Sequence, residues 1–227
     1  MPAIHPYYEA HRSVMEDSMR QRLDIVSEMF EARLGQAEAV TAKQEIMSEF
    51  EVVLGQMPYV GGAASRMSDF FMRLMGFMAI GRVLQRRGVP TDVIGEIELE
   101  SFQRQMLAVP EDVRMQAGRQ FMSPENRALM RDQATESQKK IYDGDFIYDY
   151  VEPGPNDSFE FGVNYRACGF CQFAGRHGDS DILKNICGLD FAAYELRGIH
   201  LERTQTLAGG ASHCNFRFTS KPDLREK

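Results

Sequence analysis

The sequence lacks any apolar run long enough to cross a membrane. Its longest strongly apolar stretch is the eight residues 74–81, flanked by Arg73 and Arg82, whereas a spanning helix needs roughly 20 such residues. The N-terminal segment also lacks the apolar core and the small-residue cleavage site of a secretory signal. We therefore expect a cytoplasmic protein that does not insert into a membrane.

An excess of positive charge is also absent. Lysine and arginine total 26 against 33 acidic residues, which gives a net charge of −7. A dedicated nucleic-acid binder normally has a basic face and a high pI, so we expect no nucleic-acid partner. Hydrophobic residues make up 43% of the chain and charged residues 26%, which is typical of a soluble globular protein and argues against extensive disorder.

Internal repeats and low-complexity tracts are missing, and the first part of the chain has a helical periodicity. Apolar residues recur there every three or four positions. The expected helices cover residues 8–34, 41–54, 65–87, 91–107, 110–120 and 124–141. Thr41 and Gln44 have the spacing of a capping box, and Ser123 precedes Pro124 as an N-cap. The long amphipathic segment 8–34 is a candidate surface for forming a homo-oligomer.

From residue 145 the apolar period changes from 3.6 to 2. The expected strands cover residues 146–152, 158–165, 199–207 and 213–219, with one or two short helices over 178–196. We therefore predict an α+β fold in which a helical region, 1–144, packs on a small antiparallel sheet carrying the cysteines, 145–227. The two regions are expected to form one compact domain.

All four cysteines lie in the last 60 residues. They are Cys168, Cys171, Cys187 and Cys214. In a chain of this size without a leader, reduced thiols, a metal site or a catalytic thiol are expected in preference to disulfides. A structural zinc site usually offers two close pairs of ligands, whereas only the first two of these cysteines form a C-x-x-C pair. We therefore favour no cofactor, and zinc bound by the four cysteines is the alternative.

The order of motifs around the cysteines resembles the L-2-amino-thiazoline-4-carboxylic acid hydrolase family. The motifs are Tyr165-x-x-Cys168, Cys187-x-x-Asp190, the run Arg203-Thr-Gln-Thr206-Leu207, and Cys214-x-Phe216. The segments PYVGG at 58–62 and VLQRRG at 83–88 are also similar to that family. The resemblance implies hydrolytic opening of a five-membered cyclic amidine-like ring that carries a carboxylate.

Opening such a ring requires a nucleophile, an acid and a group that recognises the carboxylate. Cys168, Cys187 and Cys214 are the candidates for a thiol-lined catalytic site, although each thiol is equally compatible with a buried small hydrophobic side chain. Asp190 shares a helix face with Cys187 because the two are three residues apart. Asp190 and His213 are the candidate proton carriers.

Five residues are candidates for binding the substrate. Arg203 is the leading group for bidentate recognition of a carboxylate. Gly61 and Gly62 precede a predicted helix and offer a backbone turn that binds anions. Tyr165 and Thr206 are included because they belong to the motifs that carry the family resemblance.

The predicted function is a hydrolase that opens a small cyclic C–N ring, amidine-like, thiazoline-like or lactam-like, bearing a carboxylate. The alternative is a sensory module without catalysis that binds a small molecule or metal, because the terminal sheet also resembles the ligand domain related to four-vinyl reductases. A hydrolase needs Asp190, Arg203 and a histidine to converge, whereas a sensor pocket would be mainly apolar.

Overall fold

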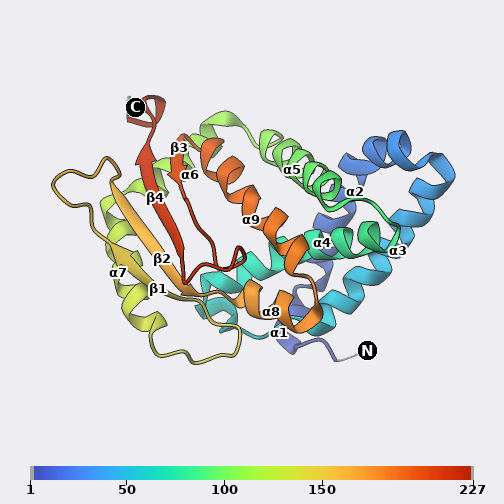
Figure 1. Cartoon of the computed structure of the whole chain (residues 1–227), viewed down its shortest axis with the longest axis horizontal. Coiled ribbons are helices and arrows are strands. Elements are labelled where there is room, and N and C mark those ends of the chain that lie inside the picture. The colour runs from blue at the N-terminus through green and yellow to red at the C-terminus, as the bar shows by residue number, and fades with distance from the viewer. Residues whose placement is uncertain (1–2, 226–227) are drawn as a thin grey trace.

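The computed structural model describes residues 3–225 and has the predicted α+β fold, with helices first and the sheet in the last third of the chain (Figure 1). The helices before the sheet are α1 (Pro6–Ala10), α2 (Arg12–Leu34), α3 (Gln36–Gln56), α4 (Arg66–Arg86), α5 (Thr91–Leu107), α6 (Glu111–Met122) and α7 (Pro124–Ser137), with a 3-10 turn, η1 (Gly62–Ala64), before α4. No helix within residues 3–225 combines the length and apolarity that a membrane span requires.

The predicted start of the second long helix is wrong. α3 begins at Gln36, directly after Gly35, whose positive φ of 78° separates it from α2. Thr41 therefore lies inside α3, and its hydroxyl donates to the carbonyl of Ala37 instead of capping the helix. The Ser123 cap is confirmed, because its Oγ accepts a hydrogen bond from the amide of Asn126.

α4 is the central helix of the helical region and is buried along most of its length. Met75, Phe77, Met78, Val83 and Leu84 are all fully buried. It packs against α2, α3, α5 and α9 (Ser180–Glu195). The contact with α9 depends on Gly81, because a Cβ at this position would come within 2.5 Å of Ile182. This close approach fixes α9, which carries two of the candidate site residues.

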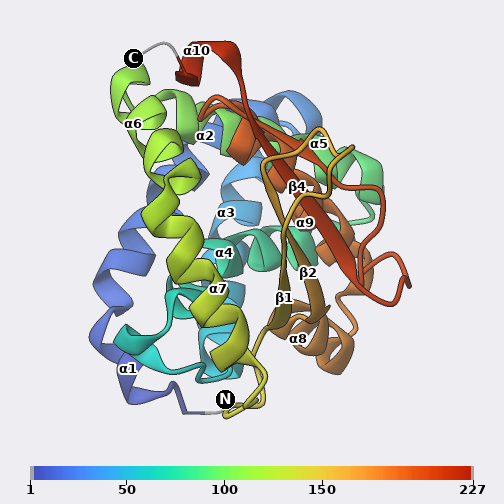
Figure 2. The same cartoon turned by 90° about the vertical axis from the view of Figure 1, so that its left-hand side faces the viewer.

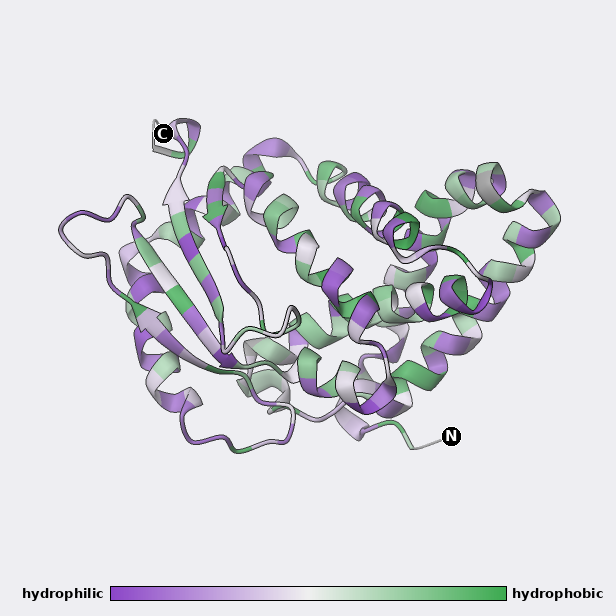
Figure 3. Cartoon of the chain, viewed as in Figure 1, coloured by the Kyte–Doolittle hydropathy of each residue, from purple (hydrophilic) through white to green (hydrophobic). Residues whose placement is uncertain are grey.

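The sheet has the strand order β1 (Ile147–Val151), β2 (Phe161–Ala167), β4 (Cys214–Ser220) and β3 (Ile199–Glu202), and all pairs are antiparallel. α7 packs beside β1 (Figure 2), and α9 packs beside β3. Apolar and polar residues alternate along β2 and β4 (Figure 3), so that Tyr165 and Cys214, which pair in register, lie on the same face as Phe216.

β3 ends at Glu202, five residues before the predicted end of this strand. The Asn215 side chain explains this difference, because its Oδ1 accepts hydrogen bonds from the amides of Thr204 and Gln205 and replaces the ladder there. At the opposite edge, side chains at the C-terminal end of α7 form hydrogen bonds with the backbone of β1. Ser137 Oγ accepts from the amide of Tyr148, and Gln138 Nε2 donates to its carbonyl.

A short helix that the sequence analysis did not predict, α8 (Gly169–His177), connects β2 to α9. Cys168 is its N-cap residue, and Gly178 ends it with a φ of 78°. Phe170, Phe173 and Ala174 are buried on one face of α8, which accounts for its formation. The chain ends in α10 (Pro222–Arg225).

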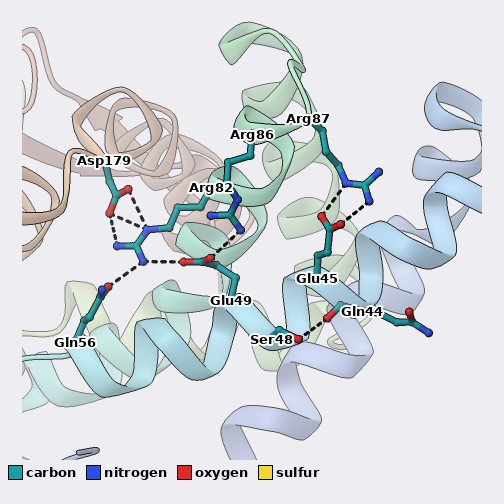
Figure 4. Close-up of polar contacts among 9 residues, drawn as sticks. All are labelled: Gln44, Glu45, Ser48, Glu49, Gln56, Arg82, Arg86, Arg87 and Asp179. Carbon is teal, nitrogen blue, oxygen red and sulfur yellow. Dashed lines mark hydrogen bonds and ion pairs between the residues drawn. The ribbon is translucent and has the colours of Figure 1, made fainter. Parts of the chain in front are cut away.

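A buried ion pair joins α4 to the turn between α8 and α9 (Figure 4). Nη2 of Arg82 lies 2.6 Å from Asp179 Oδ2, and Nη1 of Arg82 donates to Glu49 and Gln56 of α3 at 2.9 and 2.8 Å. Asp179 precedes α9 but does not cap it through its side chain. Arg86 extends the network to the surface through the other oxygen of Glu49.

Candidate functional site

A small cavity of about 100 Å³ lies between the inner face of the sheet, α4, α8 and α9. Its polar and thiol-bearing lining residues are Tyr165, Cys168, Cys187, Asp190, Tyr194, Arg203 and Cys214. The remaining lining is aromatic and aliphatic, with Phe70, Phe146 and Phe216 among its members. The structure thus brings six of the residues that the sequence analysis selected into one cavity, which we call the thiol pocket.

The residues of the thiol pocket come from several elements of the fold. Cys168 follows β2 and precedes α8, while Cys187 and Asp190 lie one turn apart on α9. Arg203 directly follows β3, and Cys214 begins β4. β4 lies between β2 and β3 and is antiparallel to both, so the residues that follow β2 and β3 lie at the same end of the sheet as the start of β4.

Arg203 is bound inside the protein. Its Nη1 donates to Asp190 Oδ2 at 2.6 Å and its Nη2 donates to the carbonyl of Cys187 at 2.8 Å. The guanidinium also stacks 4.8 Å from the ring centre of Phe191 and 5.0 Å from that of Phe216. Only 5% of the Arg203 side chain is exposed, so this arginine holds Asp190 in position from within.

Asp190 has the electrostatic character of a proton carrier. Burial raises the pKa of its carboxyl to about 6, and the charge and hydrogen bond of Arg203 partly oppose that shift. The Asp190 side chain is 39% exposed, and the residue is among those that line the thiol pocket. A carboxyl group with a pKa near neutrality can both donate and accept a proton during catalysis.

Three thiols of the pocket are protonated at neutral pH. Burial raises the pKa of Cys187 to about 12, and the negative charge of Asp190 adds to this effect. Burial also raises the pKa of Cys214, although a hydrogen bond from the amide of Leu207 to its Sγ at 3.1 Å opposes the shift. The pKa of Cys168 is raised well above the usual value, because the thiol donates a hydrogen bond to Cys171 and is also buried.

Cys171 has the opposite electrostatic behaviour. The hydrogen bond from Cys168 lowers the pKa of Cys171, and burial opposes this shift, so the two thiols titrate as a pair. Cys171 is the third residue of α8, and the first turn of a helix favours a thiolate. This thiol is not part of the pocket lining but lies behind Cys168. The sequence analysis left Cys171 out of the catalytic set, although the C-x-x-C spacing was the signal that could have included it.

Comparison with known proteins identifies the family. The family model described as L-2-amino-thiazoline-4-carboxylic acid hydrolase matches residues 75–218, which is more than half of the chain. The chain belongs to this family. No curated protein and no solved structure shows a significant match to the chain.

The part of the chain that matches the L-2-amino-thiazoline-4-carboxylic acid hydrolase family includes all four cysteines, Asp190 and Arg203. It begins within α4 and therefore leaves out α1–α3 and η1. The polar lining of the thiol pocket thus comes entirely from the segment shared with the family.

Four other candidate residues do not line the thiol pocket of this family member. His213 Nδ1 lies 3.0 Å from Ser212 Oγ, and Gln205 Nε2 is 3.2 Å from the His213 ring. Thr206 Oγ1 accepts from the amide of Gly209 within a turn. Gly61 and Gly62 have positive φ angles in the turn before α4, and a Cβ on Gly62 would come 3.0 Å from the Tyr59 hydroxyl. The turn itself therefore accounts for glycine at these two positions.

The described cysteines carry no disulfide. Within residues 3–225, histidine, cysteine, aspartate and glutamate side chains do not form any group of three or more suited to holding a metal ion. The four thiols nevertheless interact electrostatically, since the charge of Cys171 raises the pKa of both Cys187 and Cys214. The titration of each thiol in this cluster therefore depends on the others.

Proposed function

We propose that this protein is a hydrolase that opens a small cyclic C–N compound bearing a carboxylate, with Cys168 as the nucleophile. The proposal is supported by the family to which the chain belongs. The observation that carries it is the presence of Cys168 and of Asp190, a carboxyl group with a pKa of about 6, in the lining of one small apolar cavity.

In the first step, the Sγ of Cys168 attacks the sp² carbon of the ring C=N or C=O bond. Its proton moves to the thiolate of Cys171, with which it already shares a hydrogen bond. Protonated Asp190 gives its proton to the heteroatom that receives the electron pair. Arg203 keeps the carboxyl in place and stabilises the carboxylate that remains.

In the second step, the bond from the same carbon to the ring sulfur or nitrogen breaks, and the leaving atom takes a proton from Cys171. Water then attacks the carbon held by Cys168, with Asp190 accepting a proton, and the Cys168 thiolate is expelled. As the new C=O bond forms, the hydroxyl proton of this intermediate passes to Cys168, which again donates a hydrogen bond to the Cys171 thiolate. The balance is one ring opened and one water consumed, and the enzyme is regenerated.

The test is incubation of the purified protein with 2-amino-thiazoline-4-carboxylate, followed by mass spectrometry. We expect a product heavier than the substrate by one water, and we expect Cys168→Ser to abolish its formation while the protein still folds. Asp190→Asn should also lose activity, whereas Asp181→Asn, an exposed substitution on the same helix where Asp181 pairs with Lys184, should not. Full activity in Cys168→Ser would refute the thiol mechanism.

One observation favours a second candidate function, a binding module without catalysis. Most of the thiol pocket is lined by aromatic and aliphatic side chains, and no histidine is among its lining residues in the described chain. Such a module would bind an apolar small molecule and leave it unchanged. Mass spectrometry separates the two functions, because a bound ligand recovered with its original mass would support the module.

A further inference from the structure

A second and larger cavity, of about 460 Å³, lies on the other side of Asp190. We call it the arginine cavity. It is bounded by residues of α2, α4, α5 and α9 and shares five lining residues with the thiol pocket, namely Phe70, Leu74, Ile186, Asp190 and Tyr194. A molecule that reaches Asp190 from this side therefore enters the neighbourhood of the thiols.

Three arginines line this cavity: Arg22 of α2, Arg73 of α4 and Arg197, which follows α9. Arg73 is exposed and Arg197 is partly buried. Neither guanidinium has a hydrogen bond or an ion pair with another group in the part of the chain that the structure describes, residues 3–225. Burial lowers the pKa of Arg197, and the positive charge of Arg73 adds to this shift. Both residues line the same cavity.

Arg22 adds a third charge at the base of the cavity. It is only 5% exposed, its Nη2 donates to the carbonyl of Arg73 at 3.3 Å, and its guanidinium lies 3.7 Å from the ring centre of Phe77. The carboxyl group that interacts with it electrostatically, Glu98, is completely buried. Burial raises the pKa of Glu98 well above the usual value, and the positive charge of Arg22 opposes that shift. Glu98 is not among the lining residues of the arginine cavity.

Asp190 is the one acidic residue in the lining of the arginine cavity among the described residues, and its carboxylate is bound to Arg203. The cavity therefore has a net positive charge. Guanidinium groups held together without counter-ions in a partly enclosed space attract an anion, and their planar donors match a carboxylate in bidentate geometry.

We propose that Arg73 and Arg197, with Arg22 behind them, bind the carboxylate of the substrate in the arginine cavity, so that the ring is directed past Asp190 toward the thiol pocket. The inference rests on the proposed hydrolase function and replaces Arg203 in the role of carboxylate recognition. Arg203 is instead a positioning residue for Asp190, since two of its nitrogens are bound to protein oxygens.

The test is equilibrium binding by titration calorimetry with L-thiazolidine-4-carboxylate, a saturated ring without the C=N bond that hydrolysis would attack. The matching probe is its neutral carboxamide. We expect the wild-type protein to bind the carboxylate at least about tenfold more tightly than the carboxamide, because hydrogen bonds between two charged groups are stronger than those to a neutral group. Increasing salt should weaken binding of the carboxylate only.

The variants Arg73→Gln and Arg197→Gln should each weaken binding of the carboxylate by about tenfold and leave the carboxamide unaffected. The control is Arg20→Gln on α2, because Arg20 is exposed and paired with Glu16 outside the cavity. Circular dichroism establishes that each variant is folded. If a variant does not fold, the comparison of the two probes on the wild-type protein still tests the charge requirement.

Equal affinity for the two probes, no binding of the carboxylate to the wild-type protein, or unchanged affinity in folded Arg73→Gln and Arg197→Gln would each overturn the inference. Failure of the proposed function gives a different result. In that case the wild-type protein would bind the carboxylate in a manner dependent on both arginines and yet hydrolyse no ring compound.

Discussion

Replacing Arg82 by methionine should destabilise the protein strongly. The Arg82 guanidinium donates to both oxygens of Asp179 and to Glu49, and the Arg82 and Asp179 side chains are only 9% and 6% exposed. Methionine keeps most of the side-chain volume but removes the charge. The carboxylate of Asp179 is then buried without its partner, and breaking a buried pair in this way costs about 3–5 kcal/mol.

The matched control is Arg86→Met. Arg86 lies about one helical turn from Arg82 and pairs with the same Glu49 at 2.7 Å, but its side chain is 56% exposed. Ion pairs exposed to this extent contribute about 0–1 kcal/mol. A second variant, Arg82→Met with Asp179→Leu, removes both charges and should recover most of the loss, since an apolar replacement of a whole buried pair is often neutral.

The measurement is urea unfolding followed by circular dichroism, with the free energy of unfolding obtained by linear extrapolation. We expect the midpoint of Arg82→Met to fall well below that of Arg86→Met, with unchanged slopes. If the two single variants lose the same stability, or if the additional Asp179→Leu substitution deepens the loss, the reasoning from the buried pair is refuted.

Three further predictions concern the site and its support. The pKa of Asp190 is raised to about 6 in the folded protein, so between about pH 4 and 6 the folded state binds more protons at this residue than the unfolded state. The contribution of Asp190 to the free energy of unfolding therefore falls as pH rises through that range. Unfolding of Asp190→Asn, measured over the same pH range, should lack this decline. Cys171 should be the thiol that iodoacetamide alkylates fastest at neutral pH, as located by peptide mapping, and Cys168→Ala should slow it by removing the hydrogen bond that lowers the pKa of Cys171; equal rates in the two proteins would contradict this effect of the hydrogen bond. Gly81→Ala should cost about 1–3 kcal/mol in urea unfolding, because the added Cβ would lie 2.5 Å from Ile182; wild-type stability would show that α9 can move away.

The fold class and most of the thiol pocket could be predicted from local patterns. Alternation of apolar residues set the strands, and motif order selected Tyr165, Cys168, Cys187, Asp190 and Arg203, which meet in one cavity. These residues could be found because each stands at a fixed spacing from another within its own segment. Spacing within a segment does not predict which residues of other segments each of them contacts after folding.

The features that the sequence did not predict depend on contacts between distant segments. The lowered pKa of Cys171 requires α8, a nine-residue helix stabilised by the burial of Phe170 and Phe173 on the rest of the protein. The arginine cavity combines Arg22, Arg73 and Arg197 from three elements that share no motif. The cap predicted at Thr41 failed because a single glycine at position 35 already separates the two helices.

The way in which the sheet ends at its two outer strands bears on aggregation. An open strand edge can pair with another chain, and proteins avoid this with short edge strands, covering groups and charges that point inward. β3 is only four residues long and is followed at once by Arg203, which turns into the protein, while Asn215 occupies the next two amides. Side chains of Ser137 and Gln138 occupy the backbone of Tyr148 at the other edge. Arg203, which orients Asp190, therefore also helps to prevent the edge strand β3 from pairing with a strand of another molecule.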